Sequence, residues 1–441
     1  MTSTTTRQGW RRWVADVTPL RANRDFRRLW AGLTLATIGQ SVAVTAIGLQ
    51  VYDITGSTWS VGLVGLVGLV PLLALGLYGG SVVDAHDRRT VAVVASTALW
   101  VLSMATAAQA WLGANSVLLL YALVALQSAA YAVNNPARQA IVPSLVSREL
   151  LPAANALTNL SWMIGFAAGP MLCGWLVHAF GFEAAYTLDA VTYAAAVYGV
   201  VRLPPMPPAP GAGPAGLRSV LTGLAFLRTR PNVRMTFMVD LCAMVLAMPK
   251  ALFPALGMLA FGGGAATVGL LSAAIAIGSV GASLLSGPLG HVRRQGLAVL
   301  VCVVAWGGAV AVFGLTAVGA AGGVGGLRPV VDGVPGMGWM VWPACAALLV
   351  AGAADAVSAT FRTTILQAAT PEQLRGRLQG VFFVVVAGGP RLGDVAAGGA
   401  AGLAGEPWTA VLGGAACIVA VVVLAACWPG FARYDARDPR P

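Results

Sequence analysis

Charge is scarce in this chain. Asp, Glu, Lys and Arg together make up 10% of its 441 residues, whereas 58% are hydrophobic and the mean hydropathy is +0.78. A soluble domain carries roughly 25% charged residues, because its surface must be polar enough to face water. The composition therefore excludes a soluble globular protein and predicts one whose main solvent is lipid.

Residues that carry out chemistry are scarce as well. The six cysteines lie inside apolar runs without CxxC spacing, which indicates helix packing and no disulfide or metal site. The three histidines fall at predicted loops, and no paired carboxylates or nucleophile–base spacing appears. No GxxxxGK[ST] phosphate loop is present, so an ATP-driven permease would need a separate partner. We expect no enzyme, cofactor or metal.

Long apolar runs are what the chain has in abundance. A membrane-spanning helix needs about 20 apolar residues, and the first run is too long for a signal peptide. The sequence predicts twelve spans, at residues 30–50, 59–83, 91–112, 117–135, 154–177, 185–203, 235–256, 265–289, 296–318, 339–360, 378–402 and 408–428.

The basic residues set the orientation of these spans. With both termini in the cytoplasm, all but three of the 27 Lys and Arg lie on the cytoplasmic side, the exceptions being Lys250, Arg328 and Arg391. This count places Arg362 in the loop after the tenth span and Lys250 at the outer end of the seventh. Because the basic residues form short collars at helix ends near lipid headgroups, the net charge of +11 indicates no nucleic-acid partner.

A Pro- and Gly-rich segment, residues 204–216, divides the chain after the sixth span. The predicted parts are a cytoplasmic tail, a six-helix bundle, a cytoplasmic loop, a second six-helix bundle and a cytoplasmic tail, at residues 1–29, 30–203, 204–234, 235–428 and 429–441. Gly169-Pro170 recurs as Gly389-Pro390, which favours related halves. The expected fold is an all-α membrane protein with two pseudo-symmetric six-helix bundles.

The loop after the second span reads GGSVVDAHDRR, from Gly79 to Arg89. It resembles the loop 2–3 signature of the major facilitator superfamily. The resemblance implies a conformational latch made by Gly80, Asp84, Arg88 and Arg89. An ordinary basic loop that only sets topology is the alternative.

Four further segments resemble the enterobactin exporter and macrolide efflux branch of that superfamily. They are residues 53–63, 135–157, 240–256 and 366–380. The resemblance implies a monomeric, multi-pass transporter of the bacterial inner membrane with alternating access. It would export amphipathic siderophores, antibiotics or drugs by proton antiport. An importer of the same fold and an uncoupled facilitator of a small metabolite remain alternatives.

The fifth span carries GFAAGPMLCG, which resembles the antiporter signature of exporting members. Its candidate residues are Gly165, Gly169, Pro170 and Gly174. Glycines at this spacing allow close helix packing and proline kinks a helix, so a plain packing face is the alternative.

Ionisable residues inside a membrane are costly and are functional candidates by default. Four qualify: Asp240, Asp355, Arg391 and Asp394. Asp240 has no basic neighbour at helical spacing and is the first candidate for a proton carrier, with a helix-capping or gating role as the alternative. Arg391 and Asp394 share a helix face, so they either neutralise each other or act in transport.

Two other positions are expected to be less informative. Asp189 is predicted near the outer end of the sixth span, where headgroups and water would solvate it.

Many family members carry an arginine in the fourth span that is tied to proton coupling, but residues 117–134 contain no charge. Coupling would then use Asp240 or the Arg391–Asp394 pair, or protons would not be coupled.

Overall fold

A computed structural model describes residues 16–147, 149–207, 230–285, 289, 292–322, 330–331, 334–335, 338–368 and 372–435. The elements up to the central segment are α2 (Thr18–Ala22), α3 (Arg24–Thr55), α4 (Thr58–Ala85), α5 (Arg88–Trp111), α6 (Val117–Leu145) and α7 (Leu151–Val201). The later elements are α9 (Pro231–Leu246), η1 (Lys250–Leu252), α10 (Phe253–Ala255), η2 (Leu256–Ala260), α11 (Gly264–Leu284), α12 (Gln295–Ala321), β1 (Val330–Val331), β2 (Val334–Pro335), α13 (Val341–Ala368), α14 (Glu372–Ala404), α15 (Glu406–Cys427) and α16 (Pro429–Ala432).

Short polar side chains begin the long helices α3 to α6. Asn23, Ser57, Asp87 and Ser116 each accept a hydrogen bond from a backbone N–H of the first turn. These side chains satisfy N–H groups that have no partner within the helix. Gly56 then ends α3 in the left-handed conformation, with φ of 60°.

The helix α7 contains two predicted spans in one continuous element of 51 residues. At 1.5 Å per residue it would be about 75 Å long, more than twice the roughly 30 Å of a bilayer core. Gly181 breaks it with φ of 82° and ψ of 179°, a conformation that glycine adopts without strain. The chain therefore reverses at Gly181, between the predicted spans 154–177 and 185–203.

Ten helices of the described residues meet the length and mean hydropathy of a membrane span. α7 holds two of the predicted spans, and α14 with its 33 residues coincides with another, so the described helices account for all twelve predicted spans. The predicted all-helical membrane fold is confirmed. The fourth span is longer than predicted, because α6 continues through Pro136 and Pro143 to Leu145. Neighbouring helices in a bundle compensate for the backbone bonds that proline removes.

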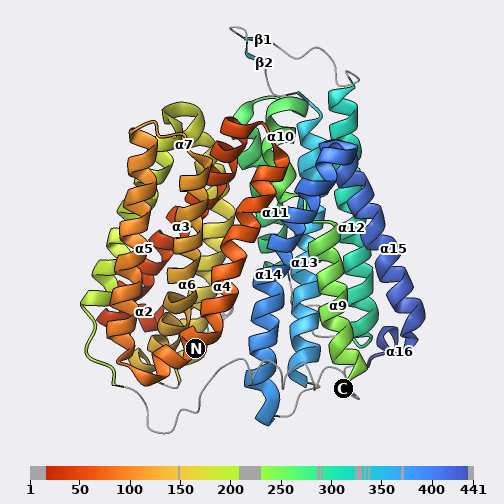
Figure 1. Cartoon of the computed structure of the whole chain (residues 1–441). Helices are drawn as coiled ribbons and strands as arrows, with labels where there is room; N and C mark the ends of the chain where they lie inside the picture. Colours follow the sequence, from red (N-terminus) through yellow and green to blue (C-terminus); the bar gives the residue numbers. More distant parts are fainter. Residues whose placement is uncertain are drawn as a thin grey trace, which may run out of the picture.

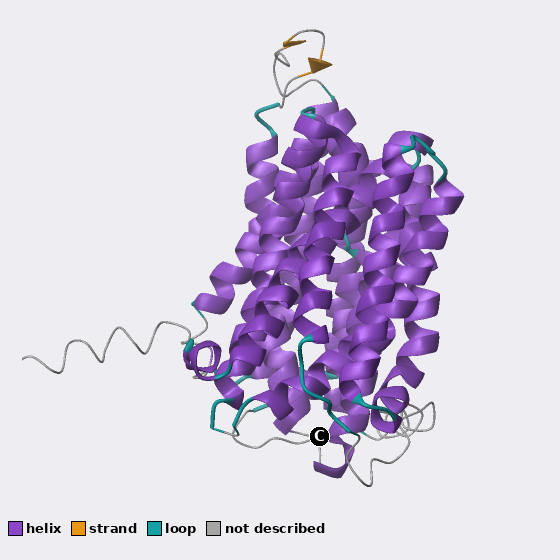
Figure 2. Cartoon of the chain, turned by 90° about the vertical axis from the view of Figure 1, so that its left-hand side faces the viewer, coloured by secondary structure: helices purple, strands orange, loops and turns teal. Residues whose placement is uncertain are grey.

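The helices form two groups side by side (Figure 1). We call α2 to α7 the first half and α9 to α16 the second half. In the first half α3 and α5 pack on α7, and α4 packs on α6. In the second half α13 packs between α11 and α12, while α15 packs on α12. Figure 2 shows the same parallel array from the side.

The array has two distinct ends (Figure 1). The short helices α2 and α16 lie at one end, which we call the terminal end. The antiparallel pair β1–β2 lies at the other, which we call the hairpin end.

Two seams join the halves: α4 with α14, and α7 with α11. Glycines bring the backbones together near the hairpin end of each. A Cβ on Gly62 would lie 2.5 Å from the carbonyl oxygen of Asp394, and one on Gly174 would lie 2.6 Å from that of Ala265. Any side chain at these two glycines would therefore push the halves apart.

A side-chain contact also closes the hairpin end. The Thr58 hydroxyl donates a hydrogen bond of 2.8 Å to Oε1 of Glu406, which connects α4 to α15. Toward the terminal end, Gly76 lies on nearly the same face of α4 as Gly62. A Cβ on Gly76 would have no atom within 4 Å. The α4 seam is therefore tight near the hairpin end and open at Gly76.

Candidate functional site

A buried arginine shared by two carboxylates lies inside the second half. Arg362 of α13 forms an ion pair with Asp240 of α9. It forms a second with Asp355, seven residues earlier on α13, at 3.3 Å between Nη2 and Oδ1. The side chains of Arg362 and Asp240 are 7% and 6% exposed, whereas that of Asp355 is 35% exposed. We call these three residues the ion triad. Asp355 is the most exposed member of the triad.

The ion triad corrects the predicted position of Arg362. The sequence places it in the loop after a span ending at 360, but α13 continues to Ala368 and Arg362 lies within it, buried. Asp240 has no basic neighbour at helical spacing on α9, and its partner comes from another helix. A hydropathy pattern cannot predict an ion pair between two helices that are far apart in the sequence.

The helix that carries Asp240 breaks midway. α9 ends at Leu246, and the chain resumes as a 3-10 turn at Lys250, so the predicted continuous span 235–256 is wrong in this respect. Pro249 causes the break, because it lacks an N–H and disfavours helix in the residue before it. The indole of Trp306 donates to the freed carbonyl of Ala247 at 3.2 Å. Non-helical backbone at this depth is characteristic of transporter binding regions.

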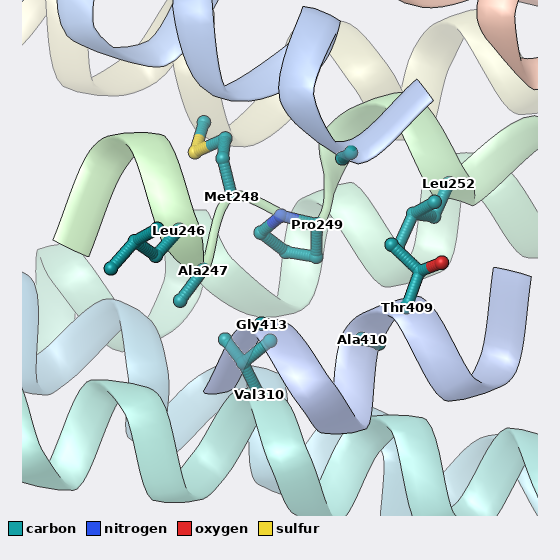
Figure 3. Close-up of a pocket in the computed structure, with 10 residues that line it drawn as sticks. Leu246, Ala247, Met248, Pro249, Leu252, Val310, Thr409, Ala410 and Gly413 are labelled. Carbon is teal, nitrogen blue, oxygen red and sulfur yellow. The ribbon is translucent and has the colours of Figure 1, made fainter. Parts of the chain in front are cut away.

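A small cavity lies beside this break (Figure 3). Ala247 and Pro249 line one side and Val310, Thr409 and Gly413 the other. About 10 Å³ is open to the centre of a water-sized sphere, the lower limit for one water molecule. The cavity is too small to hold a substrate.

Lys250, the one lysine of the sequence, lies immediately after the break. Its Nζ lies 5.6 Å from the ring centroid of Phe166, which belongs to α7 of the first half. Trp162 stacks on Phe166 at 5.9 Å. Lys250 is exposed although the turn it begins contacts α4 and α14. The predicted position at the outer end of the span is therefore wrong: Lys250 faces the space between the halves.

Arg391 and Asp394 lie on α14 at the seam with α4. A Cβ on Gly68 of α4 would lie 3.1 Å from Nη1 of Arg391, and this nitrogen has no hydrogen-bond partner among the described residues. Asp394 Oδ1 also lacks one there. The described part of the chain shows no ion pair within 4 Å between Arg391 and Asp394, although each acts electrostatically on the other. Lys250 acts on Asp394 too.

The predicted latch lies where α4 meets α5. Gly80 and Asp84 belong to α4, but their side-chain environments lie outside the described residues. Arg89 Nη2 donates to the carbonyl oxygen of Val201 at 2.8 Å, and Arg88 Nη1 to that of Ala140 at 3.4 Å. The described side-chain hydrogen bonds of both arginines are therefore to α6 and α7 of their own half.

Asp87 holds this loop together through hydrogen bonds. It was not identified from the sequence. Its carboxylate caps α5 through the Thr90 N–H at 2.8 Å and accepts from the Met206 N–H at 2.6 Å. Burial raises the pKa of Asp87, but these hydrogen bonds outweigh it and hold the pKa below its ordinary value. An aspartate directly before a helix start is the signal that could have identified it.

The glycines of the antiporter-like segment pack against two different helices. A Cβ on Gly165 or Gly169 would lie within 2.6 Å of Thr37 or Ser41 of α3. Gly174 instead meets α11 at the seam between the halves. The structure thus gives these residues close packing contacts, and their role in antiport stays a prediction.

The fourth span contains a charge beyond the stretch that was predicted to cross. Arg138 lies on α6, which continues past Asn134. It is half-buried and acts electrostatically on Tyr131 and Tyr193. Asn134, by contrast, donates to the Ser96 hydroxyl at 2.7 Å.

Comparisons with known proteins agree with this architecture. The sequence profile of the MFS_3 family, described as transmembrane secretion effector, matches residues 14–322. The enterobactin exporter EntS of Citrobacter koseri is 27% identical over 429 residues, which cover 97% of this chain and 98% of the exporter.

Solved transporters share the fold at low identity. The nucleoside transporter NupG has a TM-score of 0.67 at 15% identity, covering 92% of this chain and 99% of its own. A bacterial homologue of the iron transporter ferroportin, in an inward-facing state, has a TM-score of 0.66 at 15% identity, covering 93% and 98%. These likenesses concern the fold alone.

Proposed function

Because this chain belongs to the transmembrane secretion effector family of major facilitator transporters, we propose that it exports amphipathic small molecules by proton antiport. The cargo would be a siderophore, an antibiotic or a drug-like compound. The protein is a membrane transporter and not an enzyme. Similarity over nearly the whole chain to an enterobactin exporter supports the direction and the class of cargo.

The proposed orientation places the terminal end in the cytoplasm. The basic residues that the positive-inside rule counts gather in the segments at that end. Both termini and the segment 204–234 would then be cytoplasmic, with bundles at 30–203 and 235–428. The tight seams at Gly62 and Gly174 would lie on the outer side. In this orientation the conformation is closed outside, and cargo would enter from the cytoplasm.

The ion triad is the observation that carries the proposed coupling. Two carboxylates hold one buried arginine, and only Asp355 is substantially exposed. A proton that binds Asp355 would remove one of the two negative charges facing Arg362 and leave Arg362 to pair with Asp240 alone. Since Asp240 and Arg362 belong to different helices, the strength of the contact between α9 and α13 would change with the protonation of Asp355. The proton would leave when the triad re-forms.

The proposed cargo site lies between the halves, around Lys250. Its ammonium and the Phe166 and Trp162 rings of the other half offer a positive charge beside flat apolar surface. Arg391 lies at the neighbouring seam with an unpartnered nitrogen. This combination suits a compound with aromatic rings and an acidic group. The chain would function as a monomer with Gly80, Asp84, Arg88 and Arg89 as its cytoplasmic latch.

The test uses enterobactin as the probe, with purified protein in vesicles that expose its cytoplasmic face. A pH gradient, acidic inside, should drive accumulation of enterobactin in the vesicles. Asp240→Asn should abolish the effect of the gradient while probe exchange continues, because the triad loses its charge switch. Asp53→Asn, at an exposed carboxylate near the hairpin end of α3, is the matched control and should behave as wild type.

The alternatives give different outcomes. An importer would accumulate the probe only in vesicles of the opposite orientation under the opposite gradient. An uncoupled facilitator would equilibrate it regardless of pH. Full gradient-driven accumulation by Asp240→Asn would contradict the role of the ion triad.

A further inference from the structure

A second carboxylate is buried in the first half, away from the ion triad. Asp189 lies on α7, eight residues after the break at Gly181, and is 3% exposed. It lies about 12 Å from the hairpin end of this helix. The sequence predicts solvation at headgroup level for Asp189, and the structure contradicts this, because α3 and α5 cover the side chain.

One hydrogen bond holds the Asp189 carboxyl. The Ser103 hydroxyl of α5 lies 2.6 Å from Oδ2, and Oδ1 has no hydrogen-bond partner in the described part of the chain. On the other side, a Cβ on Gly39 of α3 would lie 3.1 Å from Oδ1. This close backbone approach leaves no room for a counter-ion from α3.

Charged residues are absent from the helices around Asp189 at its depth. Between Arg28 and Asp53 the sequence of α3 has none, and α5 has none after Arg89. The one charge on α6, Arg138, acts on Tyr193. The titratable neighbours of Asp189 are the uncharged Tyr186 and Tyr193 of its own helix.

These contacts fit a neutral carboxyl group and not an anion. A carboxylate has about four acceptor sites and needs several donors when it is buried. The described residues supply one, Ser103. A carboxylic acid needs fewer hydrogen-bond partners than a carboxylate, because its carbonyl oxygen is a weaker acceptor. Its O–H can donate to the oxygen of the Ser103 hydroxyl. We propose that Asp189 is a proton-binding site of the first half, loaded in the conformation described here.

A column of buried polar groups leads from Asp189 toward the hairpin end. Tyr186, three residues before Asp189 on α7, donates through its hydroxyl to Gln50 at 2.8 Å, and Gln50 exchanges hydrogen bonds with Gln109. Gln50 and Gln109 lie near the hairpin ends of α3 and α5. A proton can reach Asp189 along this polar column more readily than through the apolar surroundings. Its role in coupling rests on the proposed function, whereas proton binding does not.

Infrared spectroscopy of the full chain in lipid vesicles tests proton binding directly. At neutral pH the wild type should show a carbonyl band of a protonated carboxyl that Asp189→Asn lacks. Ser103→Ala should shift this band, because it removes the one hydrogen-bond partner of the carboxyl. Asp53→Asn, at an exposed carboxylate of α3, is the control and should leave the band unchanged.

A difference spectrum that contains carboxylate bands instead would overturn the proposal. If Asp189→Asn does not fold, an unshifted carbonyl band in Ser103→Ala overturns it equally. Accumulation of enterobactin under the pH gradient then tests coupling, and it should fail in Asp189→Asn while exchange continues. A wild type that does not transport, yet shows the band, would refute the proposed function and leave the proton site standing.

Discussion

The two halves of this transporter bury polar groups in different ways. In the first half the buried groups are mostly neutral and join helices by hydrogen bonds, as Gln50 does with Gln109 and Asn134 with Ser96. In the second half the described polar core centres on ions, with Arg362 between Asp240 and Asp355. Around these ions the core is aromatic and aliphatic.

This difference assigns the halves different mechanical roles. A neutral hydrogen bond between helices changes little when a proton arrives, so the first half is held together at any pH around neutrality, apart from Asp189. An ion triad changes its net charge with each proton, and its energy changes with it. The second half, with its broken helix at Pro249, is therefore the half in which protons act on an ionic contact between helices.

Breaking the ion triad should give the largest effect on stability. Arg362→Met leaves Asp240 buried without its cation, which costs about 3–5 kcal/mol. Unfolding of the purified protein in SDS, followed by tryptophan fluorescence, measures this loss. Arg293→Met, at an exposed arginine, is the control and should be neutral.

Neutralising the acids should restore the stability. The triple variant Asp240→Asn, Asp355→Asn and Arg362→Met should recover most of the loss, since no uncompensated charge remains. An Arg362→Met protein as stable as wild type would show that the triad does not hold α9 to α13.

Substitutions at the seams between the halves should give the second-largest effect. Gly62→Ala places a Cβ 2.5 Å from the Asp394 carbonyl oxygen, whereas Gly76→Ala meets nothing within 4 Å. Overpacking of this kind costs about 1–3 kcal/mol, and every 1.4 kcal/mol is about tenfold in population. Gly62→Ala should therefore depopulate the conformation that is closed at the hairpin end.

Cross-linking reads out that conformation. Cysteines at positions 58 and 406, where Thr58 contacts Glu406, should form a disulfide readily when Cys427 is replaced by serine. The yield should fall about tenfold with Gly62→Ala and stay constant with Gly76→Ala. Equal yields in both variants would mean that the α4 seam does not control closure.

Hydropathy and the distribution of basic residues were enough to predict the twelve crossings and the all-helical fold. Each of these signals is summed over about 20 residues, so one atypical residue does not change the predicted span. The helix ends were less predictable. Pro136 does not end α6, whereas Pro249 does break α9, and only the packing around each proline decides between these outcomes.

The candidate site depended on contacts that sequence spacing does not record. Asp240 and Arg362 are far apart in the chain and meet only when α9 packs on α13. Lys250 faces the space between the halves because of the break before it. Asp189 looked solvated from its distance to the helix end, but depth along a helix says nothing of which face is covered.

The smallest effect should come from the neutral contacts of the first half. In bundles of this kind a hydrogen bond between helices contributes about 0.6 kcal/mol on average. A double-mutant cycle with Asn134→Ala and Ser96→Ala, measured by unfolding in SDS, should give a coupling energy of this size. The same cycle for Asp240→Ala and Arg362→Ala should give several times more. Equal coupling in the two cycles would remove the distinction between a neutral first half and a charged second half, and with it the argument that protons act on the second.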